Sequence, residues 1–275
     1  MMAMTLFDRT ALTLHRKRAS GASFLHEAAA HELSERLQEV NRTFTNAVFV
    51  GPEAKLWSQI TGQTGRCIED SPTLDLAVGE ADLIVHGLAL HWAEDPVGQL
   101  VQMRRALRPD GMLVAALFGG QTLNELRTSF AEAEIAVEGG LSPRVAPMGE
   151  IRDLGALLQR AQLALPVADS IDLKVDYADP LALMRDLRAM GETNAVEARR
   201  RNFLRRATLM QALSHYATHF ARADGRIEAT FEVVFLTGWA PADTQQQPLR
   251  PGSAKTRLAD ALRVPEQSMD MREER

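Results

Sequence analysis

The segment from Asp82 to Gly120 is the part of the sequence that most constrains the fold. It runs DLIVHGLALHWAEDPVGQLVQMRRALRPDGMLVAALFGG, and predicts in turn a strand, an acidic turn, a helix, a turn, a strand and a glycine pair. Met112–Phe118 is apolar without a break, which is typical of a parallel strand covered on both faces. This order indicates the second half of a nucleotide-type α/β sheet.

The matching first half has an unusual loop. The apolar strand Ala47–Val50 is followed by Gly51, where a backbone can approach a ligand. A cofactor loop normally carries two further glycines so that no Cβ blocks the ligand, but Glu53 and Lys55 stand in their places. Two interpretations remain open, a degenerate cofactor loop and a plain strand-to-helix turn.

Hydrophobic periodicity places further elements along the chain. Strands that alternate with helices predict a mostly parallel α/β sheet with helices on both faces. The last two strands enclose a helical pair, which we expect to form a cap over the active edge of the sheet. The expected helices are 24–40, 53–60, 149–161, 180–190 and 196–221, and the expected strands are 66–68, 82–86, 169–177 and 230–239.

The predicted organisation has three parts. Residues 1–45 form a basic arm and a helix, and residues 46–240 form the main domain with its helical cap at about 178–225. Residues 241–275 are polar and are expected to form a flexible tail. The first twenty residues are rich in Arg and Lys, so a cleaved targeting peptide is the alternative to an arm of the mature protein.

Composition excludes several classes of function. A net charge of −5 argues against a nucleic-acid partner, which requires a basic footprint. The single cysteine, Cys67, excludes an internal disulfide and suits a reducing compartment. No apolar run is long enough to span a bilayer, although peripheral attachment stays open. We expect a cytoplasmic protein, with the mitochondrial matrix as the alternative.

Ligands of open α/β sheets bind outside the carboxyl ends of the strands, and this rule selects the first candidates. They are Gly51, Asp70, His91, Trp92 and Gly119. Asp70 can bind ribose hydroxyls or cap the following turn. Trp92 offers a stacking plane and His91 a proton switch, while the alternative is an aromatic plug between sheet and helix.

A second group of candidates follows the apolar strand. Thr122 and Glu125 have the spacing of a capping box, and Glu125 and Arg127 are expected near the mouth of the cleft. Arg144 lies in a glycine-bounded loop and can bind an anion or be solvated. Glu192 and Asn194 join the two cap helices and are candidates for substrate contact.

Other charged patterns predict no further site. His215 and His219 are four residues apart on one helix, but no Glu follows the first, so a structural pair is expected rather than a metal site. The arginines between 199 and 206 predict a solvated helix face, with an acidic partner surface as the alternative. No residue is identified as a general base, so the catalytic residues stay unassigned.

Several motifs occur in a fixed order along the chain, from about Leu6 to Pro241. They are LALHWAEDP, LRPDGMLVAALFGGQTLNELR, EGGLSPRVAP, DLGALLQRA, LMRDLRAMGETNA and ATFEVVFLTGWAP. Together they resemble the methyltransferase-fold family of the respiratory complex I assembly factor and its bacterial homologues.

The resemblance implies a Rossmann-like class I methyltransferase fold that binds S-adenosylmethionine. It also implies a protein substrate, an arginine side chain of a complex I subunit, with hydroxylation rather than methylation as the assigned reaction. By resemblance Gly51, Asp70, His91, Trp92 and Gly119 border the cofactor. The substrate-binding residues by resemblance are Glu125, Arg127, Arg144, Glu192 and Asn194.

This chain departs from the family between Gly51 and Asp82, which is short enough to lack one strand–helix unit. Two hypotheses follow. The chain is either an S-adenosylmethionine-dependent methyltransferase with reduced contacts, or a cofactor-free protein-binding assembly scaffold. An open pocket at Gly51, Asp70 and His91 favours the enzyme, whereas Glu53, Lys55 and Trp57 filling that space favours the scaffold.

Overall fold

The computed structural model describes residues 5–246, 256–257, 259–260 and 263. The chain divides into two compact units, Met1–Ala242 and Asp243–Arg275. The predicted tail at 241–275 lies largely outside the described residues. All that follows concerns the first unit.

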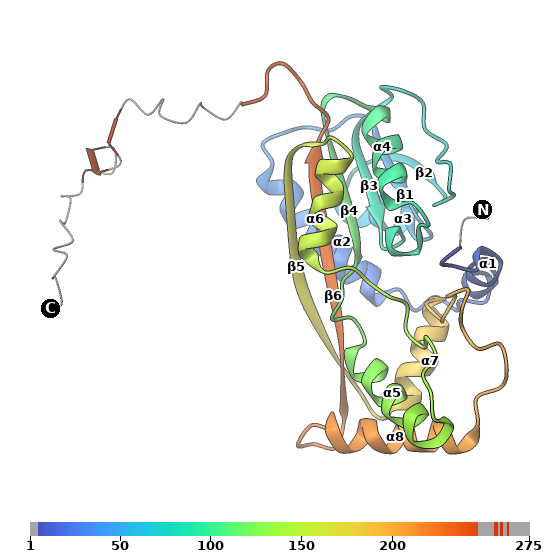
Figure 1. The fold of residues 1–275 in the computed structure, drawn as a ribbon. Helices are drawn as coiled ribbons and strands as arrows, with labels where there is room; N and C mark the ends of the chain where they lie inside the picture. Colours follow the sequence, from blue (N-terminus) through green and yellow to red (C-terminus); the bar gives the residue numbers. More distant parts are fainter. Residues whose placement is uncertain (1–4, 247–255, 258, 261–262, 264–275) are drawn as a thin grey trace, which may run out of the picture. The chain divides into compact units, whose positions relative to one another are not determined.

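Six strands form one sheet in the order β2-β1-β3-β4-β6-β5 (Figure 1). The four strands β1 to β4 are parallel, whereas β6 runs antiparallel to both β4 and β5. Because β6 is antiparallel to both of its neighbours, β5 runs in the same direction as β1 to β4, and β6 alone is reversed. The prediction of a mostly parallel sheet is therefore confirmed. The strands are β1 (Ala47–Val50), β2 (Gly65–Ile68), β3 (Ala81–Gly87), β4 (Leu107–Phe118), β5 (Ala164–Tyr177) and β6 (Ile227–Trp239).

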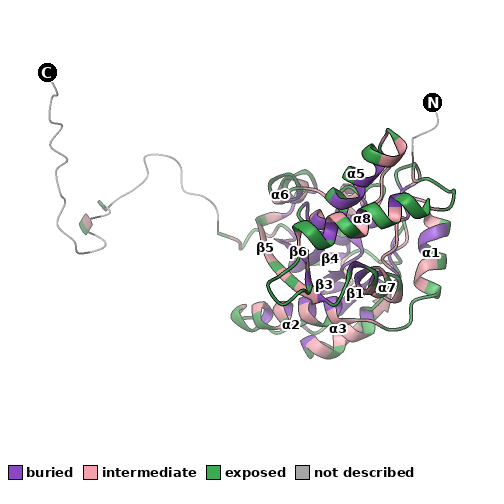
Figure 2. Cartoon of the chain, turned by 90° about the horizontal axis from the view of Figure 1, so that it is seen from below, coloured by how far each residue is buried: buried purple, intermediate pink, exposed green. Residues whose placement is uncertain are grey.

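Helices cover both faces of this sheet. They are α1 (Arg9–Lys17), α2 (Phe24–Glu39), α3 (Ala54–Thr61), α4 (Pro96–Ala106), α5 (Asn124–Glu138), α6 (Ile151–Arg160), α7 (Pro180–Met190) and α8 (Arg206–His219), with a 3-10 turn at Leu90–Trp92. In Figure 2 the buried residues lie in the strands and on the inner sides of the helices, and much of α8 is exposed.

Alternation along the strands separates the core into two layers. In β1, Phe49 belongs to the layer that contains buried residues of α2, α3, α5, α7 and α8, whereas Val48 and Val50 belong to the layer that contains buried residues of α4 and α6. Each fully buried aliphatic or aromatic side chain stabilises the fold by about 1.5–3 kcal/mol. The unbroken apolar run of β4 supplies both layers, as its sequence predicts.

The predicted capping box at the start of α5 is wrong. Leu123 precedes the helix with φ 54°, and the Thr122 hydroxyl donates to the carbonyl of Glu232 at 3.1 Å. Glu125 accepts from the amide of Thr230 at 3.2 Å and from its hydroxyl at 2.5 Å. Long-range pairing with β6 therefore takes both polar side chains away from the local cap.

Two further differences concern the N-terminal arm and the helix expected at 196–221. The arm contains α1, whose N-cap Asp8 accepts from the amide of Ala11 at 2.9 Å. The second cap helix begins only at Arg206, because residues before it are held by the arm. A β-bridge joins Phe7 to Val196, and Asp8 pairs with Arg199 at 2.8 Å.

A close contact at the end of β3 sets the position of α3. A Cβ added to Gly87 would lie 2.6 Å from Cε2 and Nε1 of Trp57, whose side chain is 1% exposed. The Trp57 indole N–H donates to Nδ1 of His26 on α2 at 3.0 Å. Gly87 thus lets one indole ring link the sheet to two helices.

We expect Gly87→Ala to lower the free energy of unfolding by about 1–3 kcal/mol, because the methyl group overlaps an indole ring that cannot withdraw. Urea unfolding followed by tryptophan fluorescence measures the change. Gly140→Ala is the matched control, since nothing lies within 4 Å of its added Cβ. Equal stability of the two variants would contradict this account of the contact.

Candidate functional site

A cavity of about 540 Å³ opens at the carboxyl ends of β1 and β2, and we call it the Gly51 cavity. Its size falls in the range of about 300–1,000 Å³ that small-molecule sites occupy. Side chains of both charges line it beside the small residues. The lining includes Arg9, Arg16, Lys17, Ala22, His26, Gly51, Glu53, Glu69, Asp70 and Met190.

Gly51 is required by the geometry at the end of β1. Its φ is 130°, and an added Cβ would lie 2.8 Å from the carbonyl oxygen of Gly87. The loop therefore brings bare backbone to the cavity wall. Glu53 and Lys55 are exposed and Trp57 is buried against Gly87, so the space beside Gly51 stays open.

Asp70 lies at the end of β2 and is 5% exposed. Its carboxylate accepts from Nη1 of Arg16 at 2.6 Å and has Nη1 of Arg9 at 3.7 Å. Arg9 also donates from Nη2 to the Asp70 carbonyl at 2.6 Å. The acid expected either to hold ribose or to cap a turn is thus paired with two arginines of α1.

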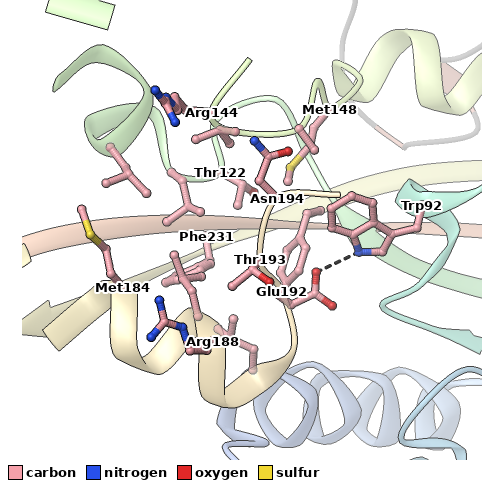
Figure 3. A pocket seen from close by; sticks show the side chains of 17 residues that line it. Trp92, Thr122, Arg144, Met148, Met184, Arg188, Glu192, Thr193, Asn194 and Phe231 are labelled. Atoms are coloured by element: carbon pink, nitrogen blue, oxygen red, sulfur yellow. Dashed lines mark hydrogen bonds between the residues drawn. The ribbon is translucent and has the colours of Figure 1, made fainter. Parts of the chain in front are cut away.

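A second cavity of about 230 Å³ lies beside the cap, and we call it the Glu192 cavity (Figure 3). Most of its wall is apolar. The lining includes Leu25, Trp92, Phe118, Thr122, Leu126, Arg144, Met148, Met184, Leu187, Arg188, Glu192, Asn194 and Phe231. It brings together Trp92, Arg144, Glu192 and Asn194, four of the residues expected from sequence.

The Glu192 carboxylate is the dominant polar group of this second cavity, and its side chain is only 10% exposed. It accepts from the Trp92 indole N–H at 2.8 Å, and Nε2 of His91 lies 3.5 Å away. Burial acts to raise the pKa of Glu192, but the hydrogen bonds of His91 and Trp92 and the charge of Arg16 outweigh it. The pKa is lowered, so Glu192 is ionised at neutral pH.

His91 and Trp92 pack as the aromatic plug that was the alternative to a site role. The Trp92 ring makes an edge contact with Phe7 at 5.1 Å, and His91 lies 4.8 Å from the Phe118 ring. The two side chains therefore fill the space between the 3-10 turn and the rings of Phe7 and Phe118. Trp92 also lines the Glu192 cavity, whereas neither residue lines the Gly51 cavity, and their cofactor role stays a prediction.

Arg144 and Asn194 hold the loop that covers the Glu192 cavity. Arg144 donates from Nε to Glu134 at 2.8 Å, and Asn194 donates from Nδ2 to the Pro143 carbonyl at 2.7 Å. Burial acts to raise the pKa of Glu134, but the hydrogen bonds from Ser142 and Arg144 outweigh it and the pKa is lowered. The anionic Glu134 therefore anchors this loop to α5.

Four predicted residues, His91, Gly119, Glu125 and Arg127, are absent from the lining of both cavities, and their assigned roles stay predictions. A Cβ added to Gly119 would lie 2.5 Å from a Glu232 carboxylate oxygen. Arg127 donates to the carbonyls of Gly120 and Thr122 at 2.9 and 3.0 Å. Glu125 is buried against Thr230, as described above.

Helix α1 contributes to the site, although no residue of this segment was expected there from the sequence. Arg9, Arg16 and Lys17 line the Gly51 cavity, although the arm had been expected to stand apart from the main domain. A signal was present, because Asp8 fits an N-cap and Arg9 and Arg16 are seven residues apart on one helix face. Periodicity alone did not say which surface that face would cover.

Among the described residues, no group of three or more His, Cys, Asp or Glu side chains is arranged to hold a metal ion. Nor does any helix in that part of the chain combine the length and apolar character needed to cross a membrane.

Two segments contribute residues to both cavities. The segment that leads into α2 gives Ala22 and His26 to the Gly51 cavity and Leu25 to the Glu192 cavity. The segment that ends α7 gives Met190 to the first and Glu192 to the second. The two cavities therefore adjoin the same two segments of the chain.

The Gly51 cavity fits S-adenosylmethionine in two respects. The bare backbone at Gly51 is a cradle that a Cβ would fill, and Arg16 presents Nε and Nη2 groups that have no hydrogen-bond partner. The order of the strands, the cavity at their carboxyl ends and the cap together define a class I methyltransferase fold that lacks one edge strand–helix unit.

Comparison with known proteins identifies the family. The Methyltransferase domain family matches residues 32–115. The arginine-hydroxylase NDUFAF5, mitochondrial, of Danio rerio is 31% identical over 95% of this chain and 91% of its own length. The human protein of that name is 37% identical over 72% of this chain and 57% of its own length. The chain belongs to the NDUFAF5 family of methyltransferase-fold proteins.

A more distant similarity links the chain to bacterial enzymes. The malonyl-[acyl-carrier protein] O-methyltransferase of Xylella fastidiosa is 36% identical over 62% of this chain and 56% of its own length. The resemblance recognised from the sequence motifs is thus confirmed at the level of the family.

Buried histidines near these cavities predict a specific pH dependence of stability. Burial lowers the pKa of His26 and of His86 to about 4, from 6.5. The unfolded chain therefore binds more protons between pH 6.5 and about 4. We expect stability to fall as the pH falls through that window, by up to about 1.4 kcal/mol per pH unit for each histidine.

Urea unfolding at a series of pH values measures the slope of stability against pH. His26→Gln keeps an acceptor for Trp57 and removes one titrating ring, so its slope should be about half that of the unmodified chain. His31→Gln, at an exposed position, is the control. An unchanged slope in His26→Gln would show that His26 does not titrate in this way.

Proposed function

We propose that this protein is an S-adenosylmethionine-dependent enzyme that acts on a guanidinium-bearing side chain of a protein substrate. The observation that carries the proposal is the buried Glu192 carboxylate. It lies in a largely apolar cavity, and the same two segments of the chain contribute residues to this cavity and to the open cavity at Gly51. A relative's printed name, arginine-hydroxylase, points to the same side chain.

The cofactor would lie in the Gly51 cavity, against the backbone of Gly51 and among the side chains of α1. When bound, S-adenosylmethionine supplies a methyl group activated by a sulfonium. Glu53 and Glu69, both exposed at the cavity, offer negative charge to the cationic part of such a ligand. Arg16 and Arg9 offer positive charge to its anionic part.

The substrate side chain would enter the Glu192 cavity. Phe118, Met184 and Phe231 provide apolar surface for a methylene stem, and Glu192 provides an acceptor for the cationic head. The lowered pKa keeps Glu192 anionic, so it orients a guanidinium by charge-assisted hydrogen bonds. Trp92 fixes the carboxylate from the opposite side.

Positioning of this kind suits methyl transfer, in which the reacting group is already activated and no general base need be identified. The relatives' printed name describes hydroxylation, which would require an oxidant as a further co-substrate. The mass gained by a modified substrate distinguishes the two, since one reaction adds a methylene and the other an oxygen atom. A complex I subunit is the substrate that the sequence resemblance implies.

The first test is isothermal titration with S-adenosylhomocysteine and S-adenosylmethionine. We expect micromolar binding to the unmodified chain, and none to Ala22→Trp, because an indole ring would fill the Gly51 cavity that Ala22 lines. Ala136→Trp, on the exposed face of α5, is the matched control and should bind normally.

A folded unmodified chain that gives no binding heat would contradict the enzyme proposal. It would favour a cofactor-free scaffold that keeps the cap and the Glu192 cavity for protein binding. Binding that survives in Ala22→Trp would place the cofactor elsewhere.

The second test concerns Glu192. We expect Glu192→Gln to weaken binding of N-acetyl-L-arginine methylamide by about tenfold or more, because a charge-assisted hydrogen bond contributes about 1.5–3 kcal/mol. NMR titration in the presence of S-adenosylhomocysteine measures it. Glu197→Gln removes a carboxylate that pairs with Arg201 instead, and serves as the control. Equal affinities would remove Glu192 from substrate recognition.

A further inference from the structure

The guanidinium of Arg16 has N–H groups that no acceptor in the described part of the chain satisfies. Nη1 donates to Oδ1 of Asp70 at 2.6 Å. Nε and Nη2 are buried and have no hydrogen-bond partner, and the whole side chain is only 17% exposed. Buried donors without an acceptor are uncommon in folded proteins, and each one calls for a ligand or another explanation.

The orphaned groups have the geometry of an anion site. Nε and Nη2 form one edge of the planar guanidinium, and this fork matches the two oxygens of a carboxylate. Asp70 already holds the side chain through Nη1, so the fork is orientated by a buried partner. A second carboxylate is the group that would complete the pairing.

The rest of α1 fixes the position of this fork at the Gly51 cavity. A Cβ added to Gly191 would lie 3.1 Å from Cα of Arg16, so the end of α7 supports the helix closely. The amide of Phe7 donates to Glu94 at 2.6 Å, and that of Asp8 to the Ala195 carbonyl at 2.7 Å. Arg9 and Lys17 add positive charge on the same cavity wall.

We propose that Arg16 binds the carboxylate of the cofactor's amino-acid part, an inference that rests on the proposed function. Asp70 then serves as the positioning residue for Arg16. The N-terminal helix thereby supplies the anion-binding half of the cavity, and backbone at Gly51 supplies the other wall. This division of contacts compensates for the glycines that the loop lacks.

The proposal predicts which ligands depend on Arg16. S-adenosylhomocysteine carries the carboxylate, whereas 5′-methylthioadenosine has the same adenosine and thioether but no amino-acid part. Removing Arg16 should therefore affect the first ligand and spare the second. A merely structural role for Arg16 would affect both ligands alike.

Isothermal titration of the full chain with both ligands is the experiment. We expect Arg16→Gln to weaken the binding of S-adenosylhomocysteine by about tenfold or more and to leave the affinity for 5′-methylthioadenosine unchanged. Arg16→Lys keeps a charge beside Asp70 and guards against a folding defect; it should show a smaller loss for S-adenosylhomocysteine only. Arg18→Gln is the control, because it removes a nearby arginine that is exposed.

The assignment of Arg16 would be overturned if Arg16→Gln and Arg16→Lys weakened the binding of both ligands equally. It would also be overturned if neither substitution changed the affinity for either ligand. Those results would leave the proposed function intact, since the unmodified chain still binds the cofactor. Failure of both ligands to bind the unmodified, folded chain would instead overturn the proposed function, and this inference with it.

Discussion

The close approach of two bare backbones at the ends of β1 and β3 is the constraint on which the rest of the site depends. Gly51 stands so near the carbonyl of Gly87 that a Cβ would lie 2.8 Å from that oxygen. Gly87 in turn receives the Trp57 ring, which bonds to His26 on α2. Without these two glycines neither the wall of the cavity nor the position of α2 and α3 could be kept.

A second dependence joins the two cavities through the end of α7. Gly191 supports α1 beneath Arg16, and the next residue, Glu192, forms the polar centre of the second cavity. The groups proposed to hold cofactor and substrate are thus set by adjacent residues. A shift of α1 would be felt at Glu192, because the same turn carries both contacts.

Local signals in the sequence were strong where one face of an element was buried. The unbroken run of β4, the Asp95–Pro96 start of α4 and the αL glycine after α7 are each found in the structure. The local signals failed where a distant hydrogen-bond partner competed with a local one. Thr122 and Glu125 turn to β6 instead of capping α5. Val196 and Arg199 are held by Phe7 and Asp8 instead of forming the start of α8.

The sequence identified the family and the α/β order of the chain, and it grouped Arg144, Glu192 and Asn194 at one predicted site, whereas the structure adds Trp92 to that group. The assignments made from sequence follow from local patterns and from motifs in a fixed order. The folded chain alone places α1 at the Gly51 cavity and pairs Asp70 with Arg16. Residues 9 to 17 and residue 70 are brought together by packing, and nothing in either segment specifies the other. Ion pairs between distant segments depend on where the sheet places each carboxylate, and that position exists only in the folded chain.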